Sequence, residues 1–328
     1  TAFLSYEYRN FALTDTTNIP GQRIINNYKE SSLSIGGELS KKQGKLLHYN
    51  ILGELAIAGE DAGQFSVEGR GDLNLRLFGD TVRLDVNAFI KNQNPVFYFR
   101  HFQSKHYWWD NNDLSKIMRT RLEGKLSLNR WGTQLRAGVE NIKNYTYLAN
   151  ASIPVKDSEG NVTGFKNNAA VRQHSGNIQI FTAMLQQKLK VGIFHLDGEV
   201  AYQKSSEQDI LPLPELSAYG NLYMKFGLAK KVLQIEMGAD VRYFSKYYAP
   251  DYSPVIGQFY NQNPDDKIEI GAFPIVNVYA NLHLKRTRFF IMMYHVNAGS
   301  GKSNYFLAPH YPINPRMIKF GLSWNFFD

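Results

Sequence analysis

Apolar and polar residues alternate along much of this chain with a period of two. The clearest case is residues 65–77, where Phe65, Val67, Gly69, Gly71, Leu73, Leu75 and Leu77 are separated by Ser66, Glu68, Arg70, Asp72, Asn74 and Arg76. Because successive side chains of a β-strand point to opposite faces, this segment predicts a strand with one apolar and one charged face. The period recurs in residues 47–57, 82–91, 118–128, 134–140, 194–203, 216–226, 233–242 and 318–326, and helical spacing is sustained nowhere. The pattern therefore predicts an all-β fold.

The connections between the predicted strands are of two kinds. Short basic turns are expected near residues 41–45, 79–80, 130–132, 190–192, 230–231 and 286–287. Long loops are expected over residues 15–27, 92–114, 150–173, 205–215, 249–269 and 297–316, with one tight link at 60–64. Two strands around each short turn, a first strand near residues 2–11 and a last near 317–327 make about 14. We predict a transmembrane antiparallel up-and-down β-barrel that fills residues 1–328 as a single domain and is closed by its first and last strands.

A soluble β-sandwich would also alternate, with polar residues outside a packed core. Three features favour a membrane barrel: charges of both signs along the whole polar face of many strands, long polar loops on one side, and aromatic residues near the predicted strand ends. Those aromatic residues are Trp108, Trp109, Trp131, Tyr145, Tyr147, Tyr243, Tyr247, Tyr248, Trp324, Phe326 and Phe327.

The charged faces of the predicted strands would line the lumen of such a barrel. The candidate lining residues are Glu68, Arg70, Asp72, Arg76, Arg83, Asp85, Arg119, Arg121, Glu123, Arg136, Glu236, Asp240 and Arg242. Basic and acidic residues on these faces are nearly balanced, so no strong ion preference is expected. Ion pairs between adjacent strands are the simpler interpretation, and a conducting pore is the more specific one.

Composition limits the function without choosing one. The 328 residues contain no cysteine, which excludes disulfides and thiolate metal sites, and the hydrophobic fraction of 43% excludes a disordered chain. No run of about 18 apolar residues predicts a transmembrane helix, and residues 1–11 lack the pattern of a signal peptide, so the chain is either not exported or already processed. The net charge of +8 suits nucleic acid or an anionic membrane surface. Taken together, the net charge and the barrel pattern predict that the basic turns contact outer-membrane lipids, lipopolysaccharide included, and that the protein does not bind nucleic acid.

Nothing in the sequence indicates catalysis, a metal or a cofactor. Residues 299–303 (GSGKS) imitate the end of a phosphate-binding loop, but Val296 stands where that motif requires glycine, and no helical pattern follows. The eight histidines have no metal-binding spacing, and the pairing of His295 with Ser300 is too little to indicate a catalytic site. We expect no catalytic residue, no metal and no cofactor, and hence no enzyme.

Several segments of the chain resemble the putative porin family of outer-membrane β-barrels from Bacteroidota. They are HYWWDNN (106–112), FSKYYAPDYSP (244–254), GQFY (257–260), GAFPIVNV (271–278), PHYP (309–312) and FGLSWNFFD (320–328). The resemblance runs from about His106 to the end of the chain and implies an outer-membrane β-barrel with porin activity. Members of the family are often longer, so an N-terminal part is expected to be missing here. The final segment also resembles the signal read by the barrel-assembly machinery.

Our leading hypothesis is passive diffusion of small hydrophilic solutes through a narrow, charged lumen, into which long loops such as residues 92–114 fold as a plug. The alternative is a non-conducting barrel subunit of a larger outer-membrane complex for assembly, secretion or transport, in contact with other barrels, with lipoproteins or with copies of itself. In both cases the termini would be periplasmic and the long loops extracellular. A third hypothesis, uptake of apolar molecules through a lateral opening, needs an inward apolar patch, and Phe89, Phe181 and Tyr219 are too few to form one.

Overall fold

The computed structural model describes residues 1–16, 23–44, 46–77, 79–302 and 304–326. Its main sheet has fourteen strands, each hydrogen-bonded to the next along the chain. The strands are β1 (Ala2–Thr16), β2 (Arg23–Lys41), β3 (Leu47–Gly59), β4 (Phe65–Leu77), β5 (Asp80–Gln93), β8 (Ile117–Leu128), β9 (Thr133–Asn150), β12 (Ala169–Val191), β13 (Phe194–Ser205), β14 (Leu216–Leu228), β15 (Leu233–Phe244), β18 (Ile275–Leu284), β19 (Thr287–Tyr294) and β22 (Met317–Trp324). All neighbouring strands are antiparallel. The prediction of an all-β, up-and-down sheet of fourteen strands is confirmed.

The remaining elements lie in the connections. They are four hairpins, β6 (His101–Gln103) with β7 (Trp108–Asp110), β10 (Ile153–Lys156) with β11 (Val162–Lys166), β16 (Asp251–Ser253) with β17 (Gln258–Tyr260) and β20 (Phe306–Ala308) with β21 (Tyr311–Pro312), the short helix α1 (Phe97–Arg100) and a 3-10 turn (Asn129–Trp131). Within the described ranges, no helix has the length and apolar character needed to cross a membrane.

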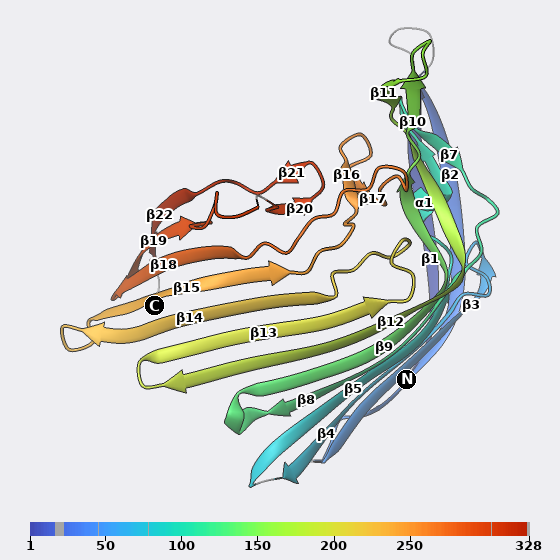
Figure 1. Cartoon of the computed structure of the whole chain (residues 1–328). Coiled ribbons are helices and arrows are strands. Elements are labelled where there is room, and N and C mark those ends of the chain that lie inside the picture. Colours follow the sequence, from blue (N-terminus) through green and yellow to red (C-terminus); the bar gives the residue numbers. More distant parts are fainter. Residues whose placement is uncertain (17–22, 45, 78, 303, 327–328) are drawn as a thin grey trace.

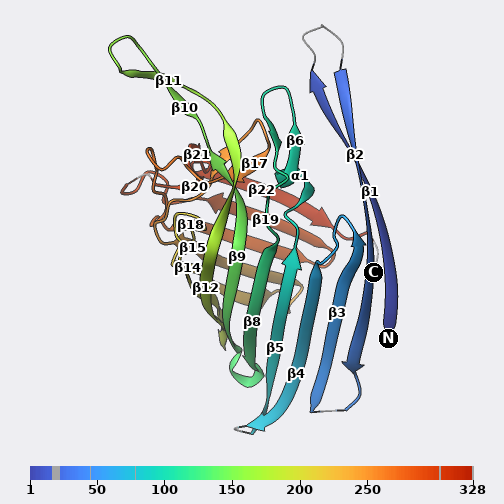
Figure 2. The same cartoon turned by 90° about the vertical axis from the view of Figure 1, so that its right-hand side faces the viewer.

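The sheet curves into a deep trough (Figures 1 and 2). Strands β1 and β22 form its two edges, on opposite sides of the opening in Figure 1, and no ladder joins them within the described part of the chain. The predicted closure by the first and last strands is therefore not found. The physical reason is curvature, because the sheet in this structure does not bend far enough for β1 to meet β22.

Short turns and long connections lie at opposite ends of the strands, as predicted. The backbone N–H of Glu38 donates to the carbonyl of Thr1, and the backbone N–H of Asn325 donates to the carbonyl of Arg286. The N-terminal end of β1 and the C-terminal end of β22 therefore both lie on the short-turn side. Strands β1 and β2 extend into the loop predicted over residues 15–27, since their backbone pairing continues to residues 16 and 23. Strand β12 begins at Ala169 and so extends into the loop predicted over residues 150–173. Residues 17–22 of that loop, Lys45 of the first turn, Ser303 of the phosphate-loop-like segment and Phe327 lie outside the described residues.

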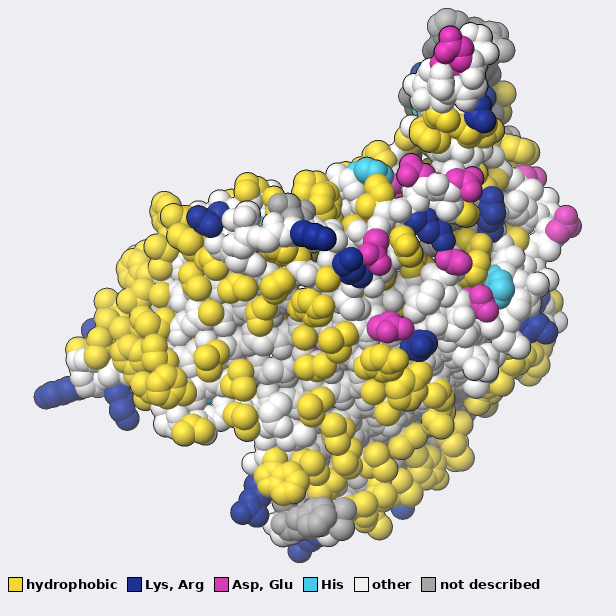
Figure 3. All heavy atoms as spheres, in the orientation of Figure 1, with side chains coloured by type: hydrophobic (Ala, Val, Ile, Leu, Met, Phe, Trp, Pro, Cys, Tyr) yellow, Lys and Arg dark blue, Asp and Glu magenta, His cyan; other side chains and the backbone are white. Residues whose placement is uncertain are grey.

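The two faces of the sheet differ in character. On one face, here called the apolar face, Leu122, Leu222 and Phe320 are 53%, 60% and 81% exposed, which means that no protein layer covers them in the described structure. Figure 3 shows such side chains spread over the outer surface of the trough, with Lys and Arg at the tips of the short turns. The opposite face, here called the charged face, carries the alternate residues of each strand. Exposed apolar side chains in this number suit contact with lipid rather than with water.

A β-bulge in β12 changes the phase of the alternation. The pairing with β9 passes from His174 opposite Tyr145 to Asn177 opposite Lys143, which inserts one extra residue into β12. Phe181 pairs with Val139 and lies on the apolar face, so its expected inward position is wrong.

The aromatic residues predicted at the strand ends are only partly found there. Trp131 and Trp324 lie at the short-turn end and are 54% and 58% exposed. Trp108 and Trp109 belong instead to the hairpin β6–β7, where the Trp109 ring stacks on Phe102. Trp109 therefore packs within the loop, whereas Trp108 is 63% exposed.

Candidate functional site

The thirteen residues predicted to line a lumen all lie on the charged face of the sheet. Paired residues of neighbouring strands point to the same side, and the register places Asp72 opposite Asp85, Asp85 opposite Lys125 and Lys125 opposite Arg136. When the pairing is followed from β9 across β12, β13 and β14, it places Glu236, Asp240 and Arg242 of β15 on this face as well. Arg76 is exposed at the short-turn end of β4.

Part of this set forms a connected ion-pair network on β4, β5 and β8. Arg83 donates from Nε to Asp85 Oδ1 over 2.8 Å, and Lys125 Nζ lies 3.0 Å from the other oxygen of Asp85. Arg83 also lies 3.9 Å from Asp72, which His48 Nδ1 approaches to 2.9 Å. Asp85 is thus shared between two cations, and Asp72 between Arg83 and the His48 imidazole. The contacts Lys125–Asp85 and Arg83–Asp72 join adjacent strands, as the simpler interpretation of the sequence predicted.

A second part of the network continues onto β9. Arg119 Nε donates to Glu140 Oε1 over 2.8 Å, and Arg121 pairs with Glu123 and approaches Glu140 to 3.8 Å. Arg136 Nε lies 3.9 Å from Glu123. The arginine side chains remain 39–45% exposed, so each pair contributes only about 0–1 kcal/mol and serves mainly to hold charge in position.

Near the short turns, the charged face contains a pocket with a volume of about 340 Å³. Its lining includes Lys41, Lys42, His48, Arg70, Asp72, Arg83, Asp85 and Lys125. Cations outnumber carboxylates here. The Arg70 side chain is 74% exposed, which leaves its guanidinium accessible to a passing solute.

The predicted residues of β15 do not join this network. Asp240 is buried and accepts a 2.9 Å hydrogen bond from Asn277 Nδ2, whereas Glu236 lies 3.4 Å from Lys225. The Arg242 guanidinium lies over the ring of Tyr219, 5.8 Å from its centroid. This part of the charged face therefore combines charges with rings and amides.

The connection between β5 and β8 folds onto the charged face of β1 and β2. The ring of Phe97 in α1 stacks on Phe11 of β1 with centroids 3.7 Å apart, and Tyr28 of β2 stacks on His101 at 4.7 Å. Because Phe11 and Tyr28 occupy paired positions on that face, the loop covers the long-loop end of these two strands. The loop of residues 92–114 thus lies on the charged face, and its role as a plug stays a prediction.

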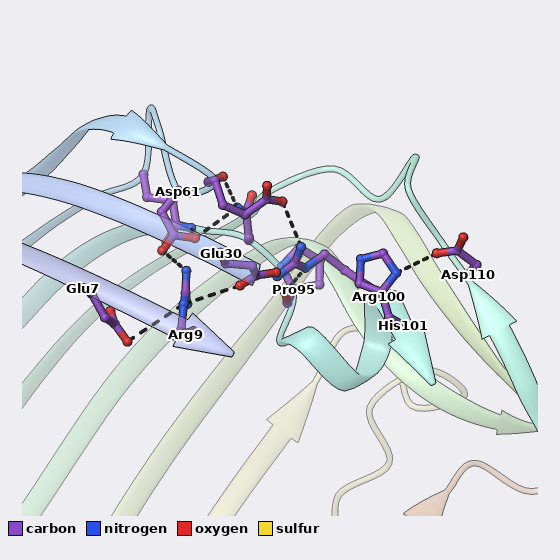
Figure 4. Close-up of polar contacts among 11 residues, drawn as sticks. Glu7, Arg9, Glu30, Asp61, Pro95, Arg100, His101 and Asp110 are labelled. Atoms are coloured by element: carbon purple, nitrogen blue, oxygen red, sulfur yellow. Dashed lines mark hydrogen bonds and ion pairs between the residues drawn. The ribbon is translucent and has the colours of Figure 1, made fainter. Parts of the chain in front are cut away.

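A buried ionic anchor holds this loop in place (Figure 4). Arg100, at the end of α1, donates to Glu30 Oε1 over 2.7 Å, to Glu60 Oε1 over 2.9 Å and to the Pro95 carbonyl over 3.1 Å. Glu30 also lies 3.4 Å from Arg9 Nε. Glu30 and Arg100 are only 6% and 9% exposed. Sequence reasoning missed the anchor because Arg100 and Glu30 are 70 residues apart and carry no local signal.

Outside the main sheet, the connections hold three groups whose pKa is shifted. The Asp157 carboxylate at the tip of β10–β11 accepts hydrogen bonds from the backbone of Asn161 and Glu159, which lower its pKa. Burial raises the pKa of the Tyr247 and Tyr260 hydroxyls in the connection after β15.

The described residues contain no group of three or more His, Cys, Asp or Glu side chains arranged for a metal ion. His295 is fully buried, with Nδ1 3.0 Å from the Asn314 carbonyl and its ring among Phe273 and Tyr305. It is therefore part of a packed loop base, whereas Ser300 is exposed.

A curved antiparallel sheet with an exposed apolar outer face, an ionic inner face, short turns at one end and long loops at the other is the wall of an outer-membrane-type transmembrane β-protein. The chain belongs to the family described as "Putative porin", whose model matches residues 1–328. The resemblance found from His106 onward thus extends over the whole chain.

The fold is similar to that of solved outer-membrane receptors and transporters. The siderophore receptor PirA from Acinetobacter baumannii has a TM-score of 0.61 at 10% identity, over 91% of this chain and 46% of that one. The copper transporter OprC has a TM-score of 0.60 at 11% identity, over 95% and 53%. A mutant of the ferric enterobactin receptor (PfeA) from Pseudomonas aeruginosa has a TM-score of 0.54 at 12% identity, over 98% and 58%. The chain thus spans about half the length of these proteins, and no curated protein matches its sequence.

Proposed function

We propose that this chain forms the lumen wall of a porin-like outer-membrane channel through which small hydrophilic solutes diffuse passively. The observation that carries the proposal is the division of one continuous sheet into an uncovered apolar face and a charged face. The exposed guanidinium groups of Arg70, Arg83 and Arg119 would offer hydrogen bonds to hydrated solutes along the wall. The function proposed is transport without catalysis, cofactor or metal.

In the membrane the sheet must be closed. The free backbone N–H and C=O groups of the edges β1 and β22 have no partner in hydrocarbon, and each unsatisfied group would cost several kcal/mol. We propose a closed antiparallel barrel in which both edges are paired, with each other or with further strands. One continuous sheet over residues 2–324 supports a single barrel domain.

For orientation, we propose periplasmic termini and short turns with the long loops outside the cell. The terminal ends of β1 and β22 lie on the short-turn side, and short periplasmic turns with longer extracellular loops are typical of such barrels. Exposed Lys41, Lys42 and Lys190 on that side would meet anionic lipid headgroups. Outer-membrane lipids, lipopolysaccharide included, and small hydrophilic solutes are the partners proposed.

The test is a planar-bilayer recording of the protein folded in detergent. We expect stepwise conductance, and the exchange Arg119→Glu with Arg121→Glu should shift ion selectivity toward cations because both side chains lie on the charged face. Lys156→Glu in the exposed hairpin β10–β11 is the matched control and should leave the selectivity unchanged. Folded protein without conductance above background would refute the channel.

Two observations favour a second function, that of a non-conducting subunit in a larger outer-membrane complex for assembly, secretion or transport. The anchored loop 94–116 covers part of the charged face, and the edges β1 and β22 are available to other strands. Purification in mild detergent separates the two functions. A porin should emerge alone or as a homo-oligomer, whereas a subunit should retain other barrels or lipoproteins in fixed ratio.

A further inference from the structure

The charged face carries a group of aromatic rings on β13, β14 and β18. The register aligns His195, Tyr223, Gly238 and Tyr279 in one row across four strands, and Tyr219 lies four residues before Tyr223 on β14. The rings of His195, Tyr219, Tyr223 and Tyr279 are here called the aromatic band. With adjacent strands about 4.8 Å apart, the row spans about 14 Å.

Local geometry holds the rings of the band in place. The rings of His195 and Tyr223 are stacked with centroids 4.8 Å apart and planes within 12°. Gly238 lies between the two tyrosines, and a Cβ there would come within 2.5 Å of Tyr223 Cβ, so only glycine permits this approach. The rings remain partly accessible, and Tyr219 is 37% exposed.

Polar groups able to bind hydroxyls adjoin the band. The next row along the strands contains Asp197, Asn221, Asp240 and Asn277. Asp240 and Asn277 are buried and hydrogen-bonded to each other, whereas Asp197 and Asn221 remain partly exposed. The Tyr223 hydroxyl donates to Asp197 Oδ2 over 3.4 Å, and the Tyr279 hydroxyl donates to Asn221 Oδ1 over 3.1 Å. Each tyrosine thus links a flat apolar ring to a carboxylate or an amide.

We propose that the aromatic band and its polar row bind neutral oligosaccharides. A pyranose ring presents C–H groups on its faces and hydroxyls around its edge, which matches rings bordered by carboxylates and amides. An organic cation would be the other ligand for exposed rings. The Arg242 guanidinium already lies over Tyr219, and a cation probe tests the remaining rings below. Phosphates and other anions are disfavoured by Asp197 and Asp240. The inference deepens the proposed channel function by naming a solute class, and it rests on that function only for its setting.

The test measures binding of maltohexaose by isothermal titration calorimetry, with the protein folded in a detergent that has no sugar headgroup. The double variant Tyr223→Ala/Tyr279→Ala should weaken binding by roughly tenfold or more, since each stacked ring contributes roughly three- to tenfold. Tyr202→Ala, which removes a ring from the apolar face, is the matched control and should bind like the unaltered protein. The variant Tyr223→Phe/Tyr279→Phe keeps both rings, and its affinity for maltohexaose should lie between that of the unaltered protein and that of the double alanine variant.

Parallel bilayer recordings keep the two proposals separable. Conductance without maltohexaose binding overturns the oligosaccharide site and leaves the channel, whereas binding without conductance overturns the channel and leaves the site. Binding that survives the double alanine variant overturns the assignment to the aromatic band. Should the alanine variant not fold, Asn221→Leu replaces it, and unchanged binding by that variant overturns the role of the polar row. Equal binding of the probe tetramethylammonium at the same residues overturns the selectivity for sugars.

Discussion

Replacement of Arg100 by alanine should release the loop of residues 94–116 from the charged face of β1 and β2. The Arg100 side chain is 11% exposed and directs three donors to Glu30, Glu60 and the Pro95 carbonyl. Its removal leaves the buried carboxylate of Glu30 with Arg9 alone, at 3.4 Å. The loop would then be held by the stacking of Phe97 on Phe11 and of His101 on Tyr28 and by side-chain hydrogen bonds such as Asn94 to the Glu60 carbonyl.

The magnitude follows from burial and from the partner that remains. Breaking a buried ion pair by removing one partner costs about 3–5 kcal/mol. Because Arg9 still neutralises Glu30, we expect the lower end of this range, about 3 kcal/mol. This free energy increases the ratio of open to docked loop by roughly a hundredfold. Arg100→Lys should cost less, since one ammonium group replaces part of the three-way contact.

The assay is hydrogen–deuterium exchange followed by mass spectrometry on the folded protein in lipid nanodiscs. Amides of residues 94–116 should exchange faster in Arg100→Ala, while those of β9 should not change. Arg70→Ala is the matched control, because that side chain is 74% exposed and lies 3.8 Å from Glu68. Exchange of the loop within about twofold of the unaltered protein would refute the reasoning, as would an equal effect of Arg70→Ala.

Three further changes have expected outcomes. Leu222→Arg should destabilise the protein by about 2–4 kcal/mol in urea unfolding from lipid vesicles if this apolar-face position lies near mid-membrane, whereas Asn221→Arg on the charged face should cost less; equal costs would contradict the assignment of faces. Gly238→Ala should cost about 1–3 kcal/mol in the same assay, because its Cβ would lie 2.4 Å from the Leu222 carbonyl oxygen, and a neutral effect would exclude this close approach. Hydrogen bonding lowers the pKa of Asp157, so its contribution to the β10–β11 tip is present above the ordinary carboxyl pKa and is lost as pH falls through the lowered value; the NMR shift of the Asn161 amide should follow that transition and lose it in Asp157→Asn.

The strand count and the two faces could be predicted because they depend on a local pattern. Alternation over residues 65–77 and 82–91 fixes which side chains share a face, whatever the rest of the chain does. The same logic placed Arg83 and Asp85 on the charged face, and strand pairing then brought them to Asp72 and Lys125.

Three features could not be read from the period. The bulge at residues 174–177 reverses the phase of β12, which is why the inward placement of Phe181 was wrong. The anchor between Arg100 and Glu30 joins distant segments, and closure depends on the total curvature of the sheet. Long-range geometry of this kind leaves no mark in the alternation of neighbouring residues.

The charged face is chemically divided, and this division has a consequence for transport. On β4–β9 carboxylates are paired with lysine or arginine, as in Asp85 and Glu140, whereas on β13–β18 Asp197 accepts from a tyrosine and Asp240 from an amide. Exposed charges more than about 8 Å apart are largely screened at physiological ionic strength, so the ionic wall acts on ions only close to itself. A neutral solute gains little there and would be retained by the rings of the aromatic band. Ion selectivity and retention of a neutral solute would therefore be set by different strands. Reversing the charge of Arg119 and Arg121 should alter ion selectivity without changing the retention of a neutral solute.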